Sequence, residues 1–124
     1  MSTANSFVPS SYSAIVTGAA RGIGEAIALK FAEQGAQVAF TYVSDSSADK
    51  AAALESKINA LGVKGKAYKS NAGDFAQCEQ LVNEVLKEFG TLDICVNNAG
   101  ISKDNLLLRM STQEHHHLIT IVLA

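Results

Sequence analysis

The stretch TGAARGIG at residues 17–24 lies between the apolar residues 14–16 and a helical pattern. Its glycines have the spacing Gly18-x-x-x-Gly22-x-Gly24, which a dinucleotide-binding loop requires between a strand and a helix. Glycines allow a tight turn and a close approach of the backbone to a pyrophosphate, and the start of the following helix attracts negative charge. A glycine-rich turn that holds no ligand is the alternative that the spacing alone leaves open.

Short apolar runs alternate with helical periodicity along the rest of the chain. This alternation is typical of βαβ units and predicts an α/β fold with a parallel sheet. The predicted strands cover residues 13–17, 37–42, 66–68 and 92–96, and the predicted helices cover residues 23–34, 48–61 and 74–89. A Gly follows each of the three helices, as expected at helix ends.

Two of the predicted helices carry apolar stripes that we expect to face the core. In the first helix, the stripe consists of Ile23, Ile27 and Phe31. In the third helix, apolar residues recur at spacings of three and four, at Phe75, Cys78, Val82, Val85 and Phe89. Asp74 with Gln77 resembles a capping box and predicts where the third helix begins.

Composition limits the classes of partner. The chain has 10 Lys and Arg residues and 12 Asp and Glu residues, which gives a formal net charge of -2. We therefore expect no binding to nucleic acid or to an anionic membrane surface. Residues 1–13 carry no basic residue, and no apolar run is long enough to span a bilayer, so a cytoplasmic location is predicted. Neither Cys78 nor Cys95 has metal-ligand spacing, and no metal site is expected.

The glycine stretch and the motif NNAG at residues 97–100 together resemble the paired signature of the short-chain dehydrogenases/reductases. The resemblance runs from about residue 14 to residue 114. Within that family, NNAGISKDNLLLRMS at residues 97–111 is similar to the 3-oxoacyl-acyl-carrier-protein reductases of type II fatty-acid synthesis. The resemblance implies a Rossmann-like doubly wound parallel sheet whose order begins 3-2-1-4. It also implies a truncated NAD(P)-binding domain over residues 13–124. Residues 1–12, which are rich in Ser and contain Pro9, are expected to form a flexible segment.

The resemblance assigns cofactor-binding roles to three groups of residues. The pyrophosphate and adenosine side is assigned to Gly18, Arg21, Gly22, Ile23 and Gly24. The adenine edge is assigned to Asn71 and Ala72. The ribose next to the nicotinamide is assigned to Asn98, Ala99 and Gly100. Asn side chains at a strand end also tie neighbouring strands together, and we expect this second role for Asn97 and Asn98 as well.

The end of the second strand indicates which dinucleotide is bound. A carboxylate there would bind the ribose 2'-hydroxyl and repel a 2'-phosphate. Tyr42 stands where NAD-using relatives carry that carboxylate, while Arg21 and Ser44 could contact a 2'-phosphate. NADP(H) is therefore the expected cofactor in preference to NAD(H). Asp45, three residues past the strand end, is the one observation that favours NAD(H).

The family reduces carbonyl groups with a Ser, a Tyr and a Lys four residues after that Tyr. This sequence offers no candidate for them, because the positions four residues after its tyrosines hold Val16, Ser46 and Ala72. A supporting Asn of the family aligns with Val122. Three hypotheses remain: the NADP(H)-binding part of a reductase that acts on a β-ketoacyl thioester of acyl-carrier protein, a non-catalytic nucleotide-binding module, or an interaction partner of full-length relatives.

The last ten residues change character. Ser111 with Glu114 predicts the start of a fourth helix, but residues 118–123 are rich in β-branched side chains. We expect this tail to lie beside the fourth strand as a fifth parallel strand. If it does not dock there, the fourth strand becomes an exposed sheet edge and self-association is expected. Three successive His residues at 115–117 point in different directions on a helix and do not predict a metal site.

Overall fold

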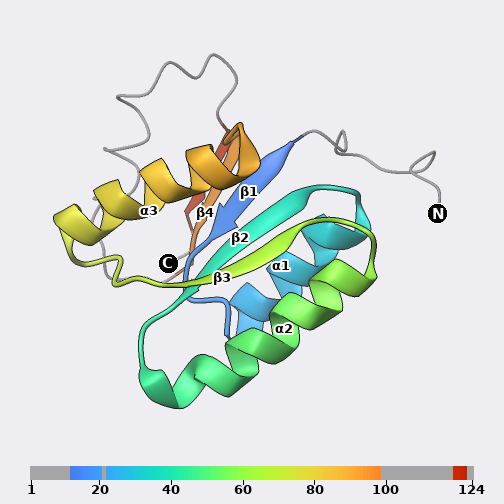
Figure 1. Cartoon of the computed structure of the whole chain (residues 1–124), viewed down its shortest axis with the longest axis horizontal. Coiled ribbons are helices and arrows are strands. Elements are labelled where there is room, and N and C mark those ends of the chain that lie inside the picture. Colours follow the sequence, from blue (N-terminus) through green and yellow to red (C-terminus); the bar gives the residue numbers. More distant parts are fainter. Residues whose placement is uncertain (1–11, 21, 99–118, 123–124) are drawn as a thin grey trace.

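The structure is a computed structural model that describes residues 12–20, 22–98 and 119–122. Its five strands form one parallel sheet in the order β3-β2-β1-β4-β5 (Figure 1). The strands are β1 (Ser13–Val16), β2 (Gln37–Tyr42), β3 (Gly65–Lys69), β4 (Ile94–Asn97) and β5 (Ile119–Val122). The helices are α1 (Gly22–Glu33), α2 (Ala48–Ala60) and α3 (Phe75–Phe89), with a short 3-10 turn η1 (Asp45–Ser47) before α2. The predicted α/β class and the strand order 3-2-1-4 are confirmed.

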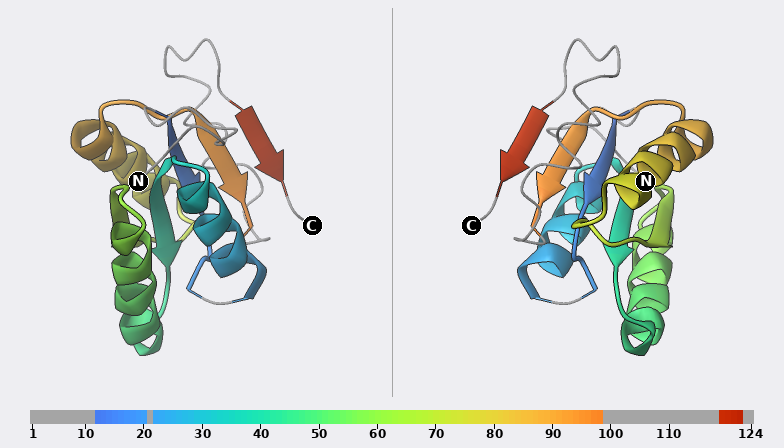
Figure 2. Two further views of the ribbon diagram at one scale, coloured as in Figure 1. Left: turned by 90° about the vertical axis from the view of Figure 1, so that its right-hand side faces the viewer. Right: turned by 90° about the vertical axis from the view of Figure 1, so that its left-hand side faces the viewer.

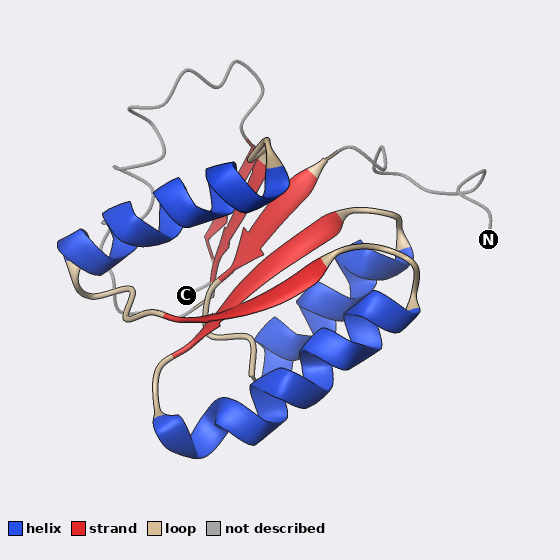
Figure 3. Cartoon of the chain, in the orientation of Figure 1, coloured by secondary structure: helices blue, strands red, loops and turns tan. Residues whose placement is uncertain are grey.

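The helices cover both faces of the sheet, with α1 and α2 on one face and α3 on the other (Figure 3). Side chains alternate between the two faces of a strand, so β1, β2, β3 and β4 each contribute to two apolar clusters. On the α1 and α2 side, Val16, Phe40 and Leu54 belong to one cluster. On the α3 side, Ile15 and Val82 belong to the other. All five side chains are almost fully buried, so the sheet lies between two apolar cores and contributes side chains to both.

Helix α1 packs through small residues as well as through part of its predicted stripe. The buried residues of α1 are Gly24, Ala28 and Ala32. Of the predicted stripe, Ile27 and Phe31 are partly buried and pack against the core, whereas Ile23 is 68% exposed. The small side chains allow the helix axis to approach the sheet closely. This close approach places the start of α1 against the end of β1.

Helix α3 begins where the capping pattern predicted. The Asp74 side chain accepts a hydrogen bond from the Gln77 backbone N–H at 3.1 Å, which satisfies one of the free donors of the first turn. Gly90 ends the helix in the left-handed region, with φ of 84°. Of the predicted stripe, only Phe75 is not buried and is 44% exposed. Figure 1 shows the reason, since the first turn of α3 extends beyond the strands.

Strand β5 pairs in parallel with β4, from Ile94 opposite Ile119 to Asn97 opposite Val122. The predicted fifth strand is therefore confirmed, and Figure 2 shows it at the outer side of β4. Residues 99–118 of the connection, which include the predicted helix start at Ser111 and the His residues at 115–117, lie outside the described residues. No helix in the described ranges has the length and apolar character needed to cross a membrane.

Candidate functional site

The glycine stretch joins the end of β1 to the start of α1. Gly18 and Gly22 have φ values of 65° and 66°, which is a region that side-chain-bearing residues seldom adopt. A Cβ added at Gly22 would contact no atom within 4 Å, so Gly22 is required for its backbone conformation. Gly24 is required for space, because an added Cβ would lie 2.5 Å from the Gly18 carbonyl oxygen. Arg21 lies outside the described residues.

The loop is tied to two neighbouring strands. The Gly18 N–H donates to the Thr41 hydroxyl at 3.0 Å, and the Ala19 N–H donates to the Thr41 carbonyl at 3.0 Å. On the other side, the Asn98 side-chain amide donates to the Gly18 carbonyl at 3.2 Å. The Asn98 backbone N–H donates to the Thr17 hydroxyl at 2.9 Å. The conformation of the loop therefore depends on β2 and β4 as well as on its own glycines.

Helix α1 begins at Gly22, within the same loop. The first backbone N–H groups of a helix have no acceptor inside the helix, and the helix dipole adds partial positive charge at this end. The loop and the helix start therefore form a surface that favours an anion such as a pyrophosphate.

A tyrosine stands at the end of β2, and a paired carboxylate follows it in the η1 turn. Tyr42 is partly buried, and Ser44, which follows it, is exposed. The Ser44 hydroxyl accepts a hydrogen bond from the Ser46 N–H at 3.1 Å, which caps the η1 turn. The Asp45 carboxylate accepts a hydrogen bond from the Lys69 ammonium at 2.6 Å, and this bond raises the pKa of Lys69. The negative charge of Asp45 is thus offset by a cation at the end of β3.

The loop after β3 is held by side-chain bonds to its backbone. The Asn71 side-chain oxygen accepts from the Gly73 N–H at 2.8 Å, so this oxygen stabilises the turn. The Asn71 N–H in turn donates to the Gln77 side-chain oxygen at 2.8 Å. Ala72 is buried, and its carbonyl accepts a long bond from the Cys78 thiol at 3.5 Å. These bonds stabilise the backbone conformation of the loop.

The strands are parallel, so their carboxyl ends meet at one edge of the sheet. Among the residues predicted for the cofactor, that edge or the helix start beside it holds Gly18, Gly22, Ile23, Gly24, Tyr42, Ser44, Asn71, Ala72 and Asn98. Ala99 and Gly100, like Arg21, lie outside the described residues.

Thr41 and Lys69 were not predicted as site residues, and Gln77 was predicted only as part of the capping box, although each orders part of this edge. Thr41 and Lys69 occupy ordinary strand positions. Their roles come only from their hydrogen bonds to other elements, Thr41 to Gly18 and Lys69 to Asp45. Gln77 did carry a signal in the predicted capping box, but its side-chain oxygen bonds Asn71 rather than the helix start.

A doubly wound parallel sheet with a glycine-rich loop between its first strand and helix defines the dinucleotide-binding class of α/β domains. The family model for short chain dehydrogenase matches residues 12–124. The chain belongs to the short-chain dehydrogenase family.

The chain is also similar to individual proteins of this kind, both in sequence and in structure. The 3-oxoacyl-[acyl-carrier-protein] reductase FabG of Staphylococcus epidermidis is 48% identical over 107 residues, which cover 86% of this chain and 43% of that protein. A short chain dehydrogenase from Burkholderia cenocepacia, solved in complex with NADP, is 44% identical with a TM-score of 0.69, over 76% of this chain and 38% of that one. A blue fluorescent protein from a metagenomic library, in complex with NADPH, is 44% identical with a TM-score of 0.70, over 73% and 36%. The chain spans less than half the length of these relatives.

Proposed function

We propose that this chain binds NADP(H) at the carboxyl edge of its sheet, as the cofactor-binding portion of a reductase similar to the 3-oxoacyl-acyl-carrier-protein reductases. The observation that carries the proposal is the glycine loop, whose positive φ values at Gly18 and Gly22 and open space beside Gly22 allow a pyrophosphate to approach the backbone. The similarity to FabG and to structures solved with NADP or NADPH supports it. The substrate of the whole protein would be a β-ketoacyl thioester carried by acyl-carrier protein.

The proposed roles follow the positions of the residues along the edge. Gly18, Gly22 and Gly24 allow the pyrophosphate to approach the start of α1, with Ile23 beside it. Asn71 and Ala72 present a fixed backbone to the adenine, and Asn98 holds the loop while it faces the ribose next to the nicotinamide. Arg21, Ser44 and Tyr42 are assigned to the 2'-phosphate, and Ala99 and Gly100 to the nicotinamide side.

The bound cofactor would supply a hydride for the reduction of a carbonyl group. The residues proposed here bind and orient it. Carbonyl reduction also needs hydroxyl donors and an acid, and none of the three tyrosines in the chain has a Lys four residues later. The proposal therefore assigns binding of the dinucleotide, rather than the proton transfer, to these 124 residues.

The 124-residue polypeptide is expected to bind NADPH without reducing an acetoacetyl thioester. General acid catalysis typically contributes about 10²- to 10⁴-fold to the rate, and the acid is absent from the residues that bind the cofactor. The measurement is the loss of NADPH absorbance in the presence of the thioester. Protein-dependent oxidation of NADPH that disappears in a Gly22→Asp variant would contradict this expectation.

NADPH is expected to bind more tightly than NADH. Arg21 can pair with the 2'-phosphate, and the strand end holds Tyr42 instead of a carboxylate that would repel it. A charged hydrogen bond of this kind contributes about 1.5 to 3 kcal/mol, or roughly ten- to hundred-fold in affinity. Titration calorimetry with both cofactors measures the difference.

The Arg21→Ala variant is expected to lose most of this preference. The exposed Lys57 of α2 offers a matched control, since Lys57→Ala also removes one positive charge and should leave the preference unchanged. Equal affinities of the original chain for the two cofactors would remove the assignment. So would an Arg21→Ala variant that still prefers NADPH.

Removing the partner of Asp45 is expected to weaken the preference as well. Lys69→Ala leaves the Asp45 carboxylate unpaired near the proposed 2'-phosphate position. Because the pair is exposed to solvent, the expected loss of NADPH affinity is only about two- to five-fold. The double variant Asp45→Asn with Lys69→Ala should recover the affinity, since it removes both charges. An unchanged ratio of NADPH to NADH affinity in Lys69→Ala would place Asp45 away from the nucleotide.

A further inference from the structure

The buried hydroxyl of Thr41 holds the beginning of the glycine loop. Thr41 is the next-to-last residue of β2 and is only 2% exposed. Its hydroxyl oxygen accepts a hydrogen bond from the Gly18 N–H at 3.0 Å, and its carbonyl oxygen accepts one from the Ala19 N–H at 3.0 Å. One residue of β2 therefore fixes two successive peptide groups of the loop, the first through its side chain and the second through its backbone.

Gly18 is held from the β4 side as well. The Asn98 side-chain amide donates to the Gly18 carbonyl at 3.2 Å, and β1 lies between β2 and β4 in the sheet. Gly18 has φ of 65° and carries no side chain that packing could lock in place. The bonds from Thr41 and Asn98 therefore determine the directions of its two polar groups.

These bonds also decide which backbone donors the loop presents. The N–H groups of residues 17–19 all donate to neighbouring strands. Helix α1 begins at Gly22, and the first N–H groups of a helix have no acceptor inside it. A pyrophosphate would therefore be bound at the start of α1, and the peptide groups before the helix set how closely it can approach.

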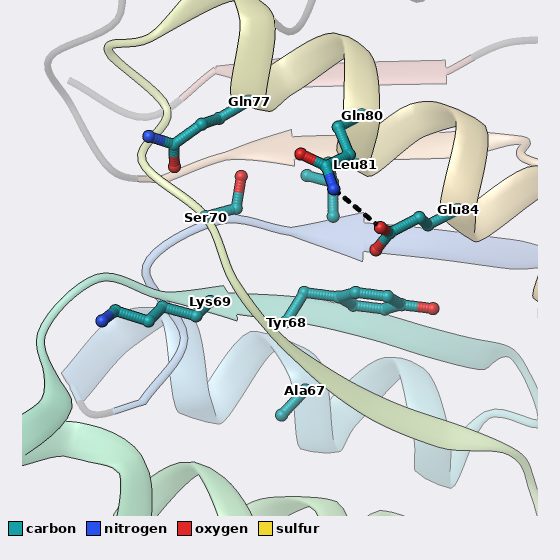
Figure 4. Close-up of a pocket in the computed structure, with 8 residues that line it drawn as sticks. All are labelled: Ala67, Tyr68, Lys69, Ser70, Gln77, Gln80, Leu81 and Glu84. Atoms are coloured by element: carbon teal, nitrogen blue, oxygen red, sulfur yellow. Dashed lines mark hydrogen bonds between the residues drawn. The ribbon is translucent and has the colours of Figure 1, made fainter.

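The hydroxyls of the adjoining strand β3 are not placed to replace that of Thr41. Tyr68 lies opposite Thr41 in the β2–β3 register. Figure 4 shows the Tyr68 ring extending away from Ser70 and lying below Glu84, and it shows the Ser70 hydroxyl directed toward α3. The hydrogen bond to the Gly18 N–H thus depends on the Thr41 hydroxyl itself.

We infer that Thr41 is a positioning residue for the cofactor: its hydroxyl fixes Gly18 and thereby the approach of the pyrophosphate to the start of α1. The inference rests on the proposed function. Because Thr41 is buried, it acts through Gly18 rather than by contact with NADP(H). Loss of the hydroxyl would leave the Gly18 N–H unpaired, which is unfavourable in a buried position, so Gly18 would turn toward another acceptor and move the loop.

The first test replaces the hydroxyl and then restores it. Thr41→Val puts a methyl group in its place and keeps the carbonyl bond to Ala19. It should weaken NADPH and NADH alike, by about five- to fifty-fold, since both carry the pyrophosphate. Thr41→Ser keeps a hydroxyl and should stay within about three-fold of the original affinities, as measured by titration calorimetry. Unchanged affinities in Thr41→Val, an equal loss in Thr41→Ser, or a loss confined to NADPH would overturn the inference.

Thr91 offers a matched control near the amino end of β4, at the other edge of the sheet. Its hydroxyl donates to the Asp93 carboxylate at 3.1 Å. Thr91→Val makes the same chemical change and should lower the Tm, because it removes a hydrogen bond, but it should leave the NADPH affinity unchanged. A loss of affinity in Thr91→Val as large as that in Thr41→Val would show that reduced stability alone weakens binding, and it would contradict a specific role for Thr41.

Hydrogen exchange of the Gly18 amide tests the hydroxyl without any cofactor. Nuclear magnetic resonance of the ¹⁵N-labelled chain should show this amide exchanging at least about ten-fold faster in Thr41→Val than in the original chain or in Thr41→Ser. Unchanged exchange would overturn the inference even if Thr41→Val bound NADPH weakly. Failure of the original chain to bind NADPH would instead refute the proposed function, and the exchange rates would still show whether the Thr41 hydroxyl holds the loop.

Discussion

A Gly24→Ala variant is expected to lose about 1 to 3 kcal/mol of folding free energy and at least about ten-fold in NADPH affinity. The added Cβ would lie 2.5 Å from the Gly18 carbonyl oxygen, 2.6 Å from the Asn98 side-chain nitrogen and 2.9 Å from the Ala19 Cα. Two of these atoms belong to the backbone, so they cannot rotate away. The loop must therefore move apart from α1, and the Asn98 bond to Gly18 is lost with it.

A variant of a second glycine, Gly90→Ala, serves as the control that separates the effect on NADPH binding from the effect on stability. Gly90 has φ of 84° and open space around it, so Gly90→Ala introduces backbone strain at the far end of α3 without a steric clash. It should lower stability by about 1 to 2 kcal/mol and leave NADPH binding unchanged. Denaturant unfolding and titration calorimetry measure the two quantities. Normal NADPH affinity in a stably folded Gly24→Ala variant would refute the role given to the loop.

Deleting residues 118–124 is expected to remove a large fraction of the roughly 5 to 15 kcal/mol that stabilises a domain, and to cause association. Strand β4 is apolar and almost fully buried at Ile94, Cys95 and Val96, and β5 pairs with each of these residues. Without β5, strand β4 becomes an edge strand that combines apolar side chains with unpaired N–H and C=O groups. Thermal unfolding and light scattering follow the two consequences.

Single prolines test the pairing without removing the tail. Successive N–H groups of a strand point to opposite sides, and among the described strands β5 is paired on one side only. Of Thr120→Pro and Ile121→Pro, one should therefore remove a ladder bond and lower the Tm clearly, while the other should have a much smaller effect. Two equally small effects would show that β5 contributes little to the fold.

Much of the architecture could be predicted from local pattern. The strand at residues 37–42 was predicted with its observed bounds, and Asp74 fixed the start of α3, because these signals depend only on neighbouring residues. The core face of α1 could be predicted only in part. A stripe of large apolar residues is the usual sign of a buried face, but the buried residues of α1 are Gly24, Ala28 and Ala32, and at Gly24 the nearby Gly18 carbonyl leaves no room for a side chain.

The candidate site was predicted only in part, for a related reason. The glycine spacing and the Asn at position 98 are visible in the sequence, but the bonds that shape the edge join residues on different strands. Lys69 was not predicted as the partner of Asp45, although its position opposite Tyr42 in the β2–β3 register places it there. The carboxylate that favoured NAD(H) in the sequence therefore has a partner that only the sheet reveals.

The bonds from Asn98 to the glycine loop also bear on the order of folding. They join Gly18 to a residue 80 positions later in the chain. Closing so long a segment costs more chain entropy than forming a local turn, so such contacts form late. A chain emerging from the ribosome would therefore carry the complete glycine motif, without the hydrogen bonds that shape it, until β4 and Asn98 have been synthesised. Competence to hold a nucleotide would arise only after β4 has joined β1.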